Sequence, residues 1–127
     1  SVESSLNYKT IDLTSDSLNV LQAADVVVSR AGLSTLSELA ALAKPAIIIP
    51  MPDTHQEANA ALVSKVGAGL VFKQNSLTIG QLIGTLSQLL NDPVEAAQLA
   101  SNLNCLIATN GAVKIADEVE KLLEIRN

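Results

Sequence analysis

The sequence predicts an α/β fold in which helices flank a parallel, Rossmann-like sheet. Short runs of β-branched residues alternate with stretches of helical periodicity, which is the pattern of strand–helix–strand units. The chain is 48% hydrophobic but only 2% aromatic, so its core must be aliphatic, as is usual between helices and a parallel sheet. Its 127 residues suffice for one domain with one core.

Four short strands are expected along the chain. The second and third, Asp25–Ser29 and Ala46–Ile49, are β-branched runs typical of strands that are buried on both faces. The first is Tyr8–Leu13 and the last is Leu70–Phe72. Because helical stretches separate them, the strands are predicted to be parallel and joined by right-handed crossovers.

Helices are expected between these strands and throughout the C-terminal part. They are Asp16–Ala24, Leu33–Ala43, Thr54–Val66, a helix that follows Thr78 and reaches Leu90, a helix that begins at Pro93, and Ala112–Ile125. Gly67 is a candidate C-cap glycine. Thr78-x-x-Gln81 fits a capping box, and Asp92 and Glu95 fit another.

Charge and composition argue against nucleic-acid binding. The formal net charge is -5, whereas phosphate contacts need clustered Lys and Arg. Only Tyr8 and Phe72 could serve as aromatic platforms for single-stranded bases. No apolar run approaches the roughly 20 residues that a membrane-spanning helix needs. A single cysteine, Cys105, fits a reducing cytoplasm, where we expect the chain to lie.

Other chemistries fail on the inventory of residues. One His and one Cys cannot build a typical zinc site. Asp53 and His55 have no serine in a nucleophile-elbow context, so a hydrolase triad is not expected. Cys105 lies in a helical stretch and is interpreted as a core residue.

Polar residues gather at two strand-to-helix junctions, where open α/β sheets bind ligands. In the first junction, Ser34, Thr35 and Glu38 share one arc of the expected helix, near an N-terminus that favours an anion. Gly32 would let a phosphate approach the backbone closely, and the Glu38 carboxylate could accept hydrogen bonds from two ribose hydroxyls. Thr35-x-x-Glu38 also fits a capping box, in which both residues would be structural.

The second junction follows the Ala46–Ile49 strand. Thr54-x-x-Glu57 fits a capping box, so those two residues are interpreted as structural. Asn59 falls inside the apolar arc of its helix, where a buried amide must be paired, either with neighbouring backbone or with a ligand and its loop. His55 and Gln56 lie in the first helical turn and could reach sugar hydroxyls, although a lone His there is more often a surface residue.

Five segments, in this order, carry a resemblance to a known family: Ala24–Gly32, Thr35–Leu39, Lys44–Pro50, His55–Ala60 and Val66–Gly69. The series is similar to the C-terminal domain of the MurG family of UDP-N-acetylglucosamine transferases, in glycosyltransferase family 28. The resemblance covers Tyr8 to the C-terminus. It implies that residues 1–127 are a partial, nucleotide-sugar-binding C-terminal domain of a two-domain GT-B glycosyltransferase, whose first strands and N-terminal acceptor domain are absent.

The resemblance implies a role for several substrate-binding residues. Glu38 matches the glutamate that binds the donor ribose, and Thr35 matches a residue near the α-phosphate. Gln56 and the position of His55 match a pair that contacts the N-acetylglucosamine hydroxyls. At the His55 position the best-known members carry a glutamine, and Ser34 replaces an apolar residue, so the identity of the sugar stays open.

The implied reaction is inverting transfer of N-acetylglucosamine from UDP-N-acetylglucosamine to lipid I in peptidoglycan synthesis. Helix-terminal N–H groups would stabilise the charge on the leaving UDP, with no metal or other cofactor needed at this half. The acceptor domain would bind the lipid-linked acceptor and supply the general base, so no catalytic residue is expected in this chain, which should be inactive alone. The full-length protein would be peripheral on the inner face of the cell membrane. Leu13 and Thr14 would fall near the uracil-binding segment.

Three alternatives remain open at the level of sequence. The chain could belong to another UDP-sugar transferase that makes a glycolipid or polysaccharide, or to a subunit that completes its site only with a partner chain. The related non-hydrolysing UDP-N-acetylglucosamine epimerase is disfavoured by the Ser29–Gly32 junction.

With part of its sheet missing, the chain would expose the edge of Asp25–Ser29 or Tyr8–Leu13, and we expect self-association through that edge.

Overall fold

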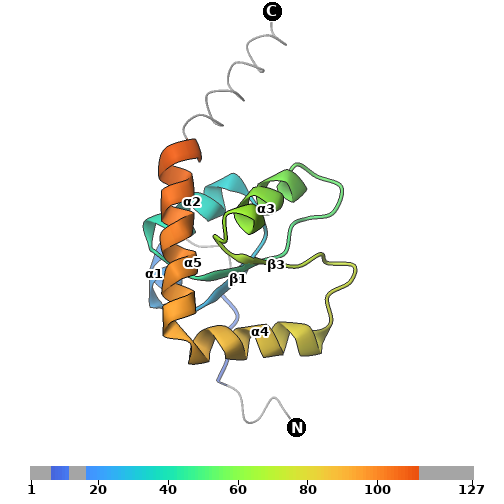
Figure 1. Cartoon of the computed structure of the whole chain (residues 1–127). Helices are drawn as coiled ribbons and strands as arrows, with labels where there is room; N and C mark the ends of the chain where they lie inside the picture. Colours follow the sequence, from blue (N-terminus) through green and yellow to red (C-terminus); the bar gives the residue numbers. More distant parts are fainter. Residues whose placement is uncertain (1–6, 12–16, 112–127) are drawn as a thin grey trace, which may run out of the picture.

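The computed structural model describes residues 7–11 and 17–111 of the chain. Strands and helices alternate from α1 to β3, and the described part after β3 is helical (Figure 1). The elements are α1 (Ser17–Ala23), β1 (Val27–Ser29), α2 (Leu33–Ala41), β2 (Ala46–Ile48), α3 (Gln56–Lys65), β3 (Leu70–Val71), α4 (Ile79–Asn91) and α5 (Pro93–Leu106), followed by a short π-helical segment, Ile107–Gly111.

The sheet has three parallel strands in the order β1-β2-β3. Ile47 in the central strand lies opposite Val28 on one side and Leu70 on the other. The predicted α/β class with parallel strands is therefore confirmed, and β1 and β3 are the edges of the sheet within the described residues.

The first predicted strand is wrong where the structure describes it. The segment Tyr8–Ile11 forms no strand, and Tyr8 is 71% exposed. Its sequence, Tyr-Lys-Thr-Ile, contains residues that are common in strands, but it gains no neighbouring strand and no buried face in the described structure. Leu13, Thr14 and the predicted helix Ala112–Ile125 lie outside the described residues.

Two aliphatic clusters occupy the two faces of the sheet. Ile47 and Ile48 are adjacent in β2 and fully buried, and they point to opposite faces, as alternation along a strand requires. Ile48 packs in the cluster under α2 and α3, whereas Ile47 packs with Leu89 of α4. Figure 1 shows α2 and α3 on one side of the sheet and α4 on the other. Buried Leu or Ile side chains each contribute about 1.5–3 kcal/mol to stability.

Helix α5 passes from the α4 layer to the α2 layer. It gives Leu99 to the cluster around Ile47, and Leu103 and Leu106 to the other cluster. Cys105 lies on the opposite side of this helix and is exposed, so its interpretation as a core residue is wrong. The reason is the helical period, since 105 is about 200° around the helix from 103 and falls outside the buried stripe.

Local capping signals explain where several helices begin and end. Gln81 N–H donates to Thr78 Oγ1 (3.1 Å) and Thr78 N–H donates to Gln81 Oε1 (2.9 Å), which confirms the predicted capping box of α4. At the start of α5, Asp92 Oδ1 accepts from Glu95 N–H (3.1 Å). The predicted capping box is only half formed there, because the Glu95 carboxylate accepts from Gln88 Nε2 instead. Gly67 follows α3 with φ of +65°, the left-handed conformation of a helix-terminating glycine, as predicted.

Candidate functional site

The carboxyl ends of β1 and β2 bring the two polar junctions together. The strands are neighbours in register, with Ser29 opposite Ile48. The β1–α2 junction and the β2–α3 junction therefore lie side by side at the carboxyl ends of the strands, as the sequence predicts. A hollow of about 450 Å³ opens beside the junctions. It is lined by Val28, Ser29, Arg30, Ile49, Gln74 and Leu77, and none of the predicted site residues is among them.

The N-terminus of α2 is open to a ligand. Its N-cap residue is Gly32, with extended backbone (φ -69°, ψ 140°) and no side chain to cap the first turn. The first turn also carries no acidic residue. A Cβ at Gly32 would meet only Gln56 Nε2, at 3.9 Å, so the backbone can be approached closely here. Free N–H groups at a helix N-terminus form a site that favours an anion.

Thr35 and Glu38 lie three residues apart on α2, so they share a face of the helix. The capping-box interpretation of these two residues is wrong, because α2 begins at Leu33 after Gly32 and both residues lie inside the helix. Both are half-buried, and Ser34 beside them is exposed. Within the part of the chain that the structure describes, no hydrogen bond or ion pair engages the side chain of Thr35 or Glu38.

Gln56 joins the two junctions through its side-chain oxygen. Gln56 Oε1 accepts a hydrogen bond from Ala31 N–H (3.3 Å) in the first junction and from Met51 N–H (3.0 Å) in the second. Both lone pairs of this oxygen are therefore used, and the amide nitrogen is left beside Gly32. Two N–H donors on one side of the amide fix which end is oxygen.

Asn59 binds the same loop from one helical turn further along α3. Its Nδ2 donates to the carbonyl oxygen of Ala31 at 3.0 Å. The expectation that this amide must be paired is confirmed, and the partner in the structure is the backbone of the neighbouring loop. Ala31 is completely buried, so these side chains satisfy both of its backbone polar groups.

The capping box expected at Thr54 and Glu57 does not form, so that prediction is wrong. The N-cap of α3 is His55, and α3 has no side-chain cap. Thr54 Oγ1 instead donates to Met51 O (2.7 Å) and accepts from Gln56 N–H (3.2 Å). The hydroxyl closes the preceding turn, in which Asp53 has a left-handed φ of 59°. His55 itself is exposed at the start of α3.

Arg30 lies at the same edge, and the sequence alone does not single it out. Its Nη1 donates to Ile49 O (3.2 Å) and Pro50 O (3.4 Å), so it ties the end of β1 to the end of β2. The side chain is exposed and lines the 450 Å³ hollow. A cation directly after a β-branched strand is the one sequence signal that could have found it.

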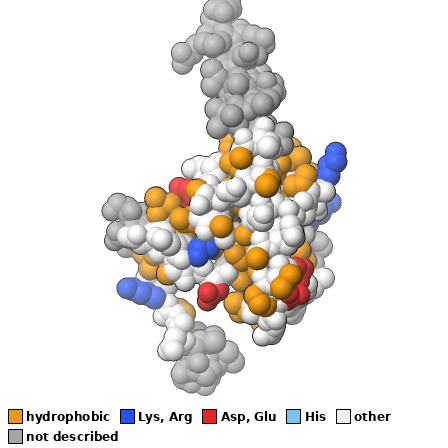
Figure 2. Space-filling view, turned by 60° about the vertical axis from the view of Figure 1, so that its left-hand side comes forward, with side chains coloured by type: hydrophobic (Ala, Val, Ile, Leu, Met, Phe, Trp, Pro, Cys, Tyr) orange, Lys and Arg blue, Asp and Glu red, His pale blue; other side chains and the backbone are white. Residues whose placement is uncertain are grey.

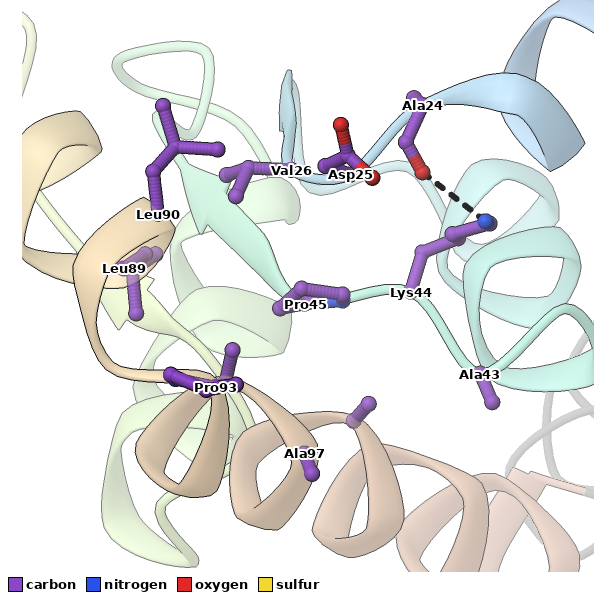
Figure 3. Close-up of a pocket in the computed structure, with 12 residues that line it drawn as sticks. Ala24, Asp25, Val26, Ala43, Lys44, Pro45, Leu89, Leu90, Pro93 and Ala97 are labelled. Carbon is purple, nitrogen blue, oxygen red and sulfur yellow. Dashed lines mark hydrogen bonds between the residues drawn. The ribbon is translucent and has the colours of Figure 1, made fainter.

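A different hollow, of about 400 Å³, lies at the amino ends of the strands (Figure 3). Asp25 and Lys44 are its charged members, and α4 and α5 complete its wall. Lys44 Nζ donates to Gln22 O (2.7 Å) and Ala24 O (2.9 Å), so the ammonium group binds the end of α1. This hollow lies at the opposite ends of the strands from the two junctions, so it is separate from the candidate site.

Residues 7–11 and 17–111 contain no group of three or more His, Cys, Asp or Glu side chains placed to hold a metal ion. None of the helices in those ranges is long and apolar enough to cross a membrane.

An open parallel sheet with polar groups beyond the carboxyl ends of its strands is the architecture of nucleotide-binding α/β domains. The profile of the glycosyltransferase family 28 C-terminal domain matches residues 1–119. The chain belongs to this family.

Two curated relatives carry the same name. UDP-N-acetylglucosamine--N-acetylmuramyl-(pentapeptide) pyrophosphoryl-undecaprenol N-acetylglucosamine transferase from Trichormus variabilis is 38% identical over 108 residues, which cover 83% of this chain and 30% of the relative. The protein of the same name from Rhodospirillum rubrum is 40% identical over 112 residues, covering 84% of this chain and 28% of the relative. The chain thus spans about 30% of the length of the curated relatives it matches.

Solved structures agree on the fold. A crystal structure of Acinetobacter baumannii MurG superposes with a TM-score of 0.67 and 26% identity, over 86% of this chain and 32% of that one. Spinosyn forosaminyltransferase SpnP superposes with a TM-score of 0.60 and 23% identity, over 94% of this chain and 33% of that one, and supports the fold alone. The predicted Rossmann-like fold of a GT-B glycosyltransferase and the resemblance to the MurG family are confirmed.

Proposed function

We propose that the chain is the donor-binding part of a longer inverting glycosyltransferase, which transfers N-acetylglucosamine from UDP-N-acetylglucosamine to lipid I in peptidoglycan synthesis. The observation that carries this proposal is the open N-terminus of α2, with Thr35 and Glu38 unengaged on one helix face, in a chain of glycosyltransferase family 28. The shared name of the relatives supports the choice of donor and acceptor.

The α2 N-terminus would hold the diphosphate of the donor. Gly32 allows close approach of an anion, and the N–H groups of the first turn supply donors without a competing side-chain cap. In the transfer, the acceptor hydroxyl attacks the anomeric carbon and the bond to the UDP oxygen breaks. Negative charge then develops on the leaving UDP, where fixed N–H groups stabilise it. Thr35, within that turn, would lie near the α-phosphate, and exposed Ser34 would lie beside it.

Glu38 would bind the ribose of the donor. An ionised carboxylate only accepts hydrogen bonds, and its two oxygens can take one hydroxyl each. Glu38 is half-buried and lies on the same helix face as Thr35, one turn from the N-terminus of α2. This placement would put the ribose one turn along the helix from the phosphates.

His55 and Gln56 would contact the sugar. Gln56 Nε2 lies beside Gly32 and keeps its two donors, because the side-chain oxygen alone engages the loops. His55 is exposed at the start of the same helix and can donate or accept. A second candidate function, transfer of another UDP-linked sugar to a glycolipid or polysaccharide, is favoured by His55 at a position where the best-known family members carry glutamine.

We further propose that the remaining strands of the sheet and the acceptor-binding domain lie upstream in the full-length protein. The chain covers about 30% of the length of its relatives, and Val28 of the edge strand β1 is 42% exposed. Hydrophobic side chains are also spread over the face drawn in Figure 2. The isolated chain would self-associate through the β1 edge and would not turn over. The full-length protein would be cytoplasmic and peripheral on the inner face of the cell membrane.

Calorimetric titration of the full-length protein with UDP-N-acetylglucosamine tests the proposal. Glu38→Ala should weaken binding by about 1–3 kcal/mol, the usual cost of leaving polar partners unpaired. Glu57→Ala is the matched control, because it removes the same group from the exposed surface of α3. If the wild-type protein binds neither UDP nor a UDP-sugar, the family likeness describes the fold and not this function.

A further inference from the structure

We infer that Asn59 is a positioning residue of the donor site, acting through the Ala31–Gly32 peptide bond rather than through contact with the donor. The inference rests on the proposed function and assigns a part in it to a residue that would otherwise count as a packed amide. Three observations carry it: the partner that Asn59 binds, the geometry of the peptide that contains this partner, and the helix that begins there.

The nitrogen of the Asn59 amide binds the protein backbone. Nδ2 donates to Ala31 O at 3.0 Å, and the side chain is half-buried on the face of α3 that packs toward the first junction. Gln56 lies one turn earlier on α3 and accepts from Ala31 N–H at 3.3 Å. Two side chains of one helix therefore hold the groups on either side of the buried Ala31 Cα, and α3 fixes this loop in two places.

The carbonyl group that Asn59 binds belongs to the same peptide unit as the N–H of Gly32. No cis peptide bond occurs in the described residues, and a trans peptide is planar, with its C=O and N–H pointing in opposite directions. By holding Ala31 O on the α3 side, Asn59 directs Gly32 N–H away from α3. That N–H donates to no acceptor among the described residues.

Gly32 is also the N-cap of α2, and its carbonyl accepts the first helical hydrogen bond, from Leu36 N–H at 3.0 Å. The orientation of the Ala31–Gly32 peptide therefore sets where the Gly32 N–H points, directly before the free N–H groups of the first turn of α2. A glycine has no side chain to restrict its backbone, so a bond from outside the loop must supply that restriction. Asn59 supplies this restriction, which would hold the backbone in place for binding the donor diphosphate.

A positioning role predicts which ligands respond when Asn59 is changed. If Asn59 acts on the α2 N-terminus, Asn59→Ala should lower the affinity for UDP and the affinity for UDP-N-acetylglucosamine by the same factor, about tenfold. If Asn59 contacted the sugar directly, only UDP-N-acetylglucosamine would bind more weakly. Asn59→His should restore most of the affinity, because His Nδ1 is as many bonds from Cα as Asn Nδ2 and can donate to Ala31 O.

Asn104 provides the control for a purely structural loss. Its Nδ2 donates to Ala40 O at 3.1 Å, near the other end of α2, so Asn104→Ala removes the same kind of bond from the same helix. Both alanine variants should lower the melting temperature to a similar extent, but only Asn59→Ala should lower the affinity for UDP.

The experiment is calorimetric titration of the full-length protein and its variants with UDP and with UDP-N-acetylglucosamine, alongside thermal denaturation. An equal loss of affinity for both ligands in Asn59→Ala, with recovery in Asn59→His, is the expected result. Wild-type binding that Asn59→Ala leaves intact, or weakens no more than Asn104→Ala does, overturns the inference while the proposed function stands. A wild-type protein that binds neither ligand overturns both.

Discussion

Replacing Gln56 by leucine should loosen the contact between the two junctions and lower the stability of the protein. The change removes the oxygen that accepts from Ala31 N–H and Met51 N–H. Ala31 is completely buried, so its orphaned N–H costs about 1–3 kcal/mol. Met51 is 45% exposed and its N–H can take water instead, so only the net value of a hydrogen bond, about 1 kcal/mol, is lost there. The expected total is about 2–4 kcal/mol.

Gln56→Glu separates this effect from side-chain packing, because a carboxylate oxygen can still accept from both N–H groups. Urea denaturation of the two variants gives the free energies of unfolding, and native-state amide exchange reports on Ala31 and Met51 directly. Faster exchange at these two amides should occur in Gln56→Leu and not in Gln56→Glu. Equal stability of the two variants, or unchanged exchange at Ala31, would show that the Gln56 oxygen does not hold the loops together.

Three further predictions concern positions outside the site. Thr78→Ala should cost about 0.5–2 kcal/mol by removing the N-cap of α4, and Thr78→Ser should recover most of it; thermal denaturation measures both. Gly84→Ala should stabilise α4 by up to about 1 kcal/mol, because a Cβ there meets nothing within 4 Å. Gly69→Ala should destabilise, since its Cβ would lie 3.0 Å from Val63 Cγ1 and 3.3 Å from Ala46 O; a melting temperature at or above wild type would contradict this.

Much of the fold could be predicted because its signals are local. Asp25–Ser29 and Ala46–Ile49 contain the observed β1 and β2. The capping box of α4 forms as its spacing predicts, and Asp92 caps α5 as predicted, although Glu95 does not complete that box. The strand predicted over Tyr8–Ile11 is wrong because a β-like run also needs a neighbouring strand. That is a property of the sheet and not of the segment. The prediction that Cys105 is a core residue is wrong because it lies two residues from the buried Leu103, so its side chain points away from the protein core.

The location of the candidate site could be predicted from the sequence, but the hydrogen bonds that hold its loops together could not. Parallel neighbouring strands guarantee that the two junctions meet, so Thr35, Glu38 and Gln56 could be assigned to one edge of the sheet. A capping-box pattern at Thr35 looked equally good in sequence, and only the start of α2 at Leu33 excludes it. The bonds from α3 to Ala31 span 25 and 28 residues, and no local pattern encodes a contact of that range.

Helix α5 ties the two faces of the sheet into one cooperative unit. Its first half fills the core that contains Ile47, and its second half fills the core that contains Ile48. If either α4 or α2 separated fully from the sheet, buried leucines of α5 would become exposed to water. Local opening of one layer is therefore coupled to the other layer. Amide protons in the centres of α2 and α4 should therefore exchange with nearly the same free energy, that of global unfolding.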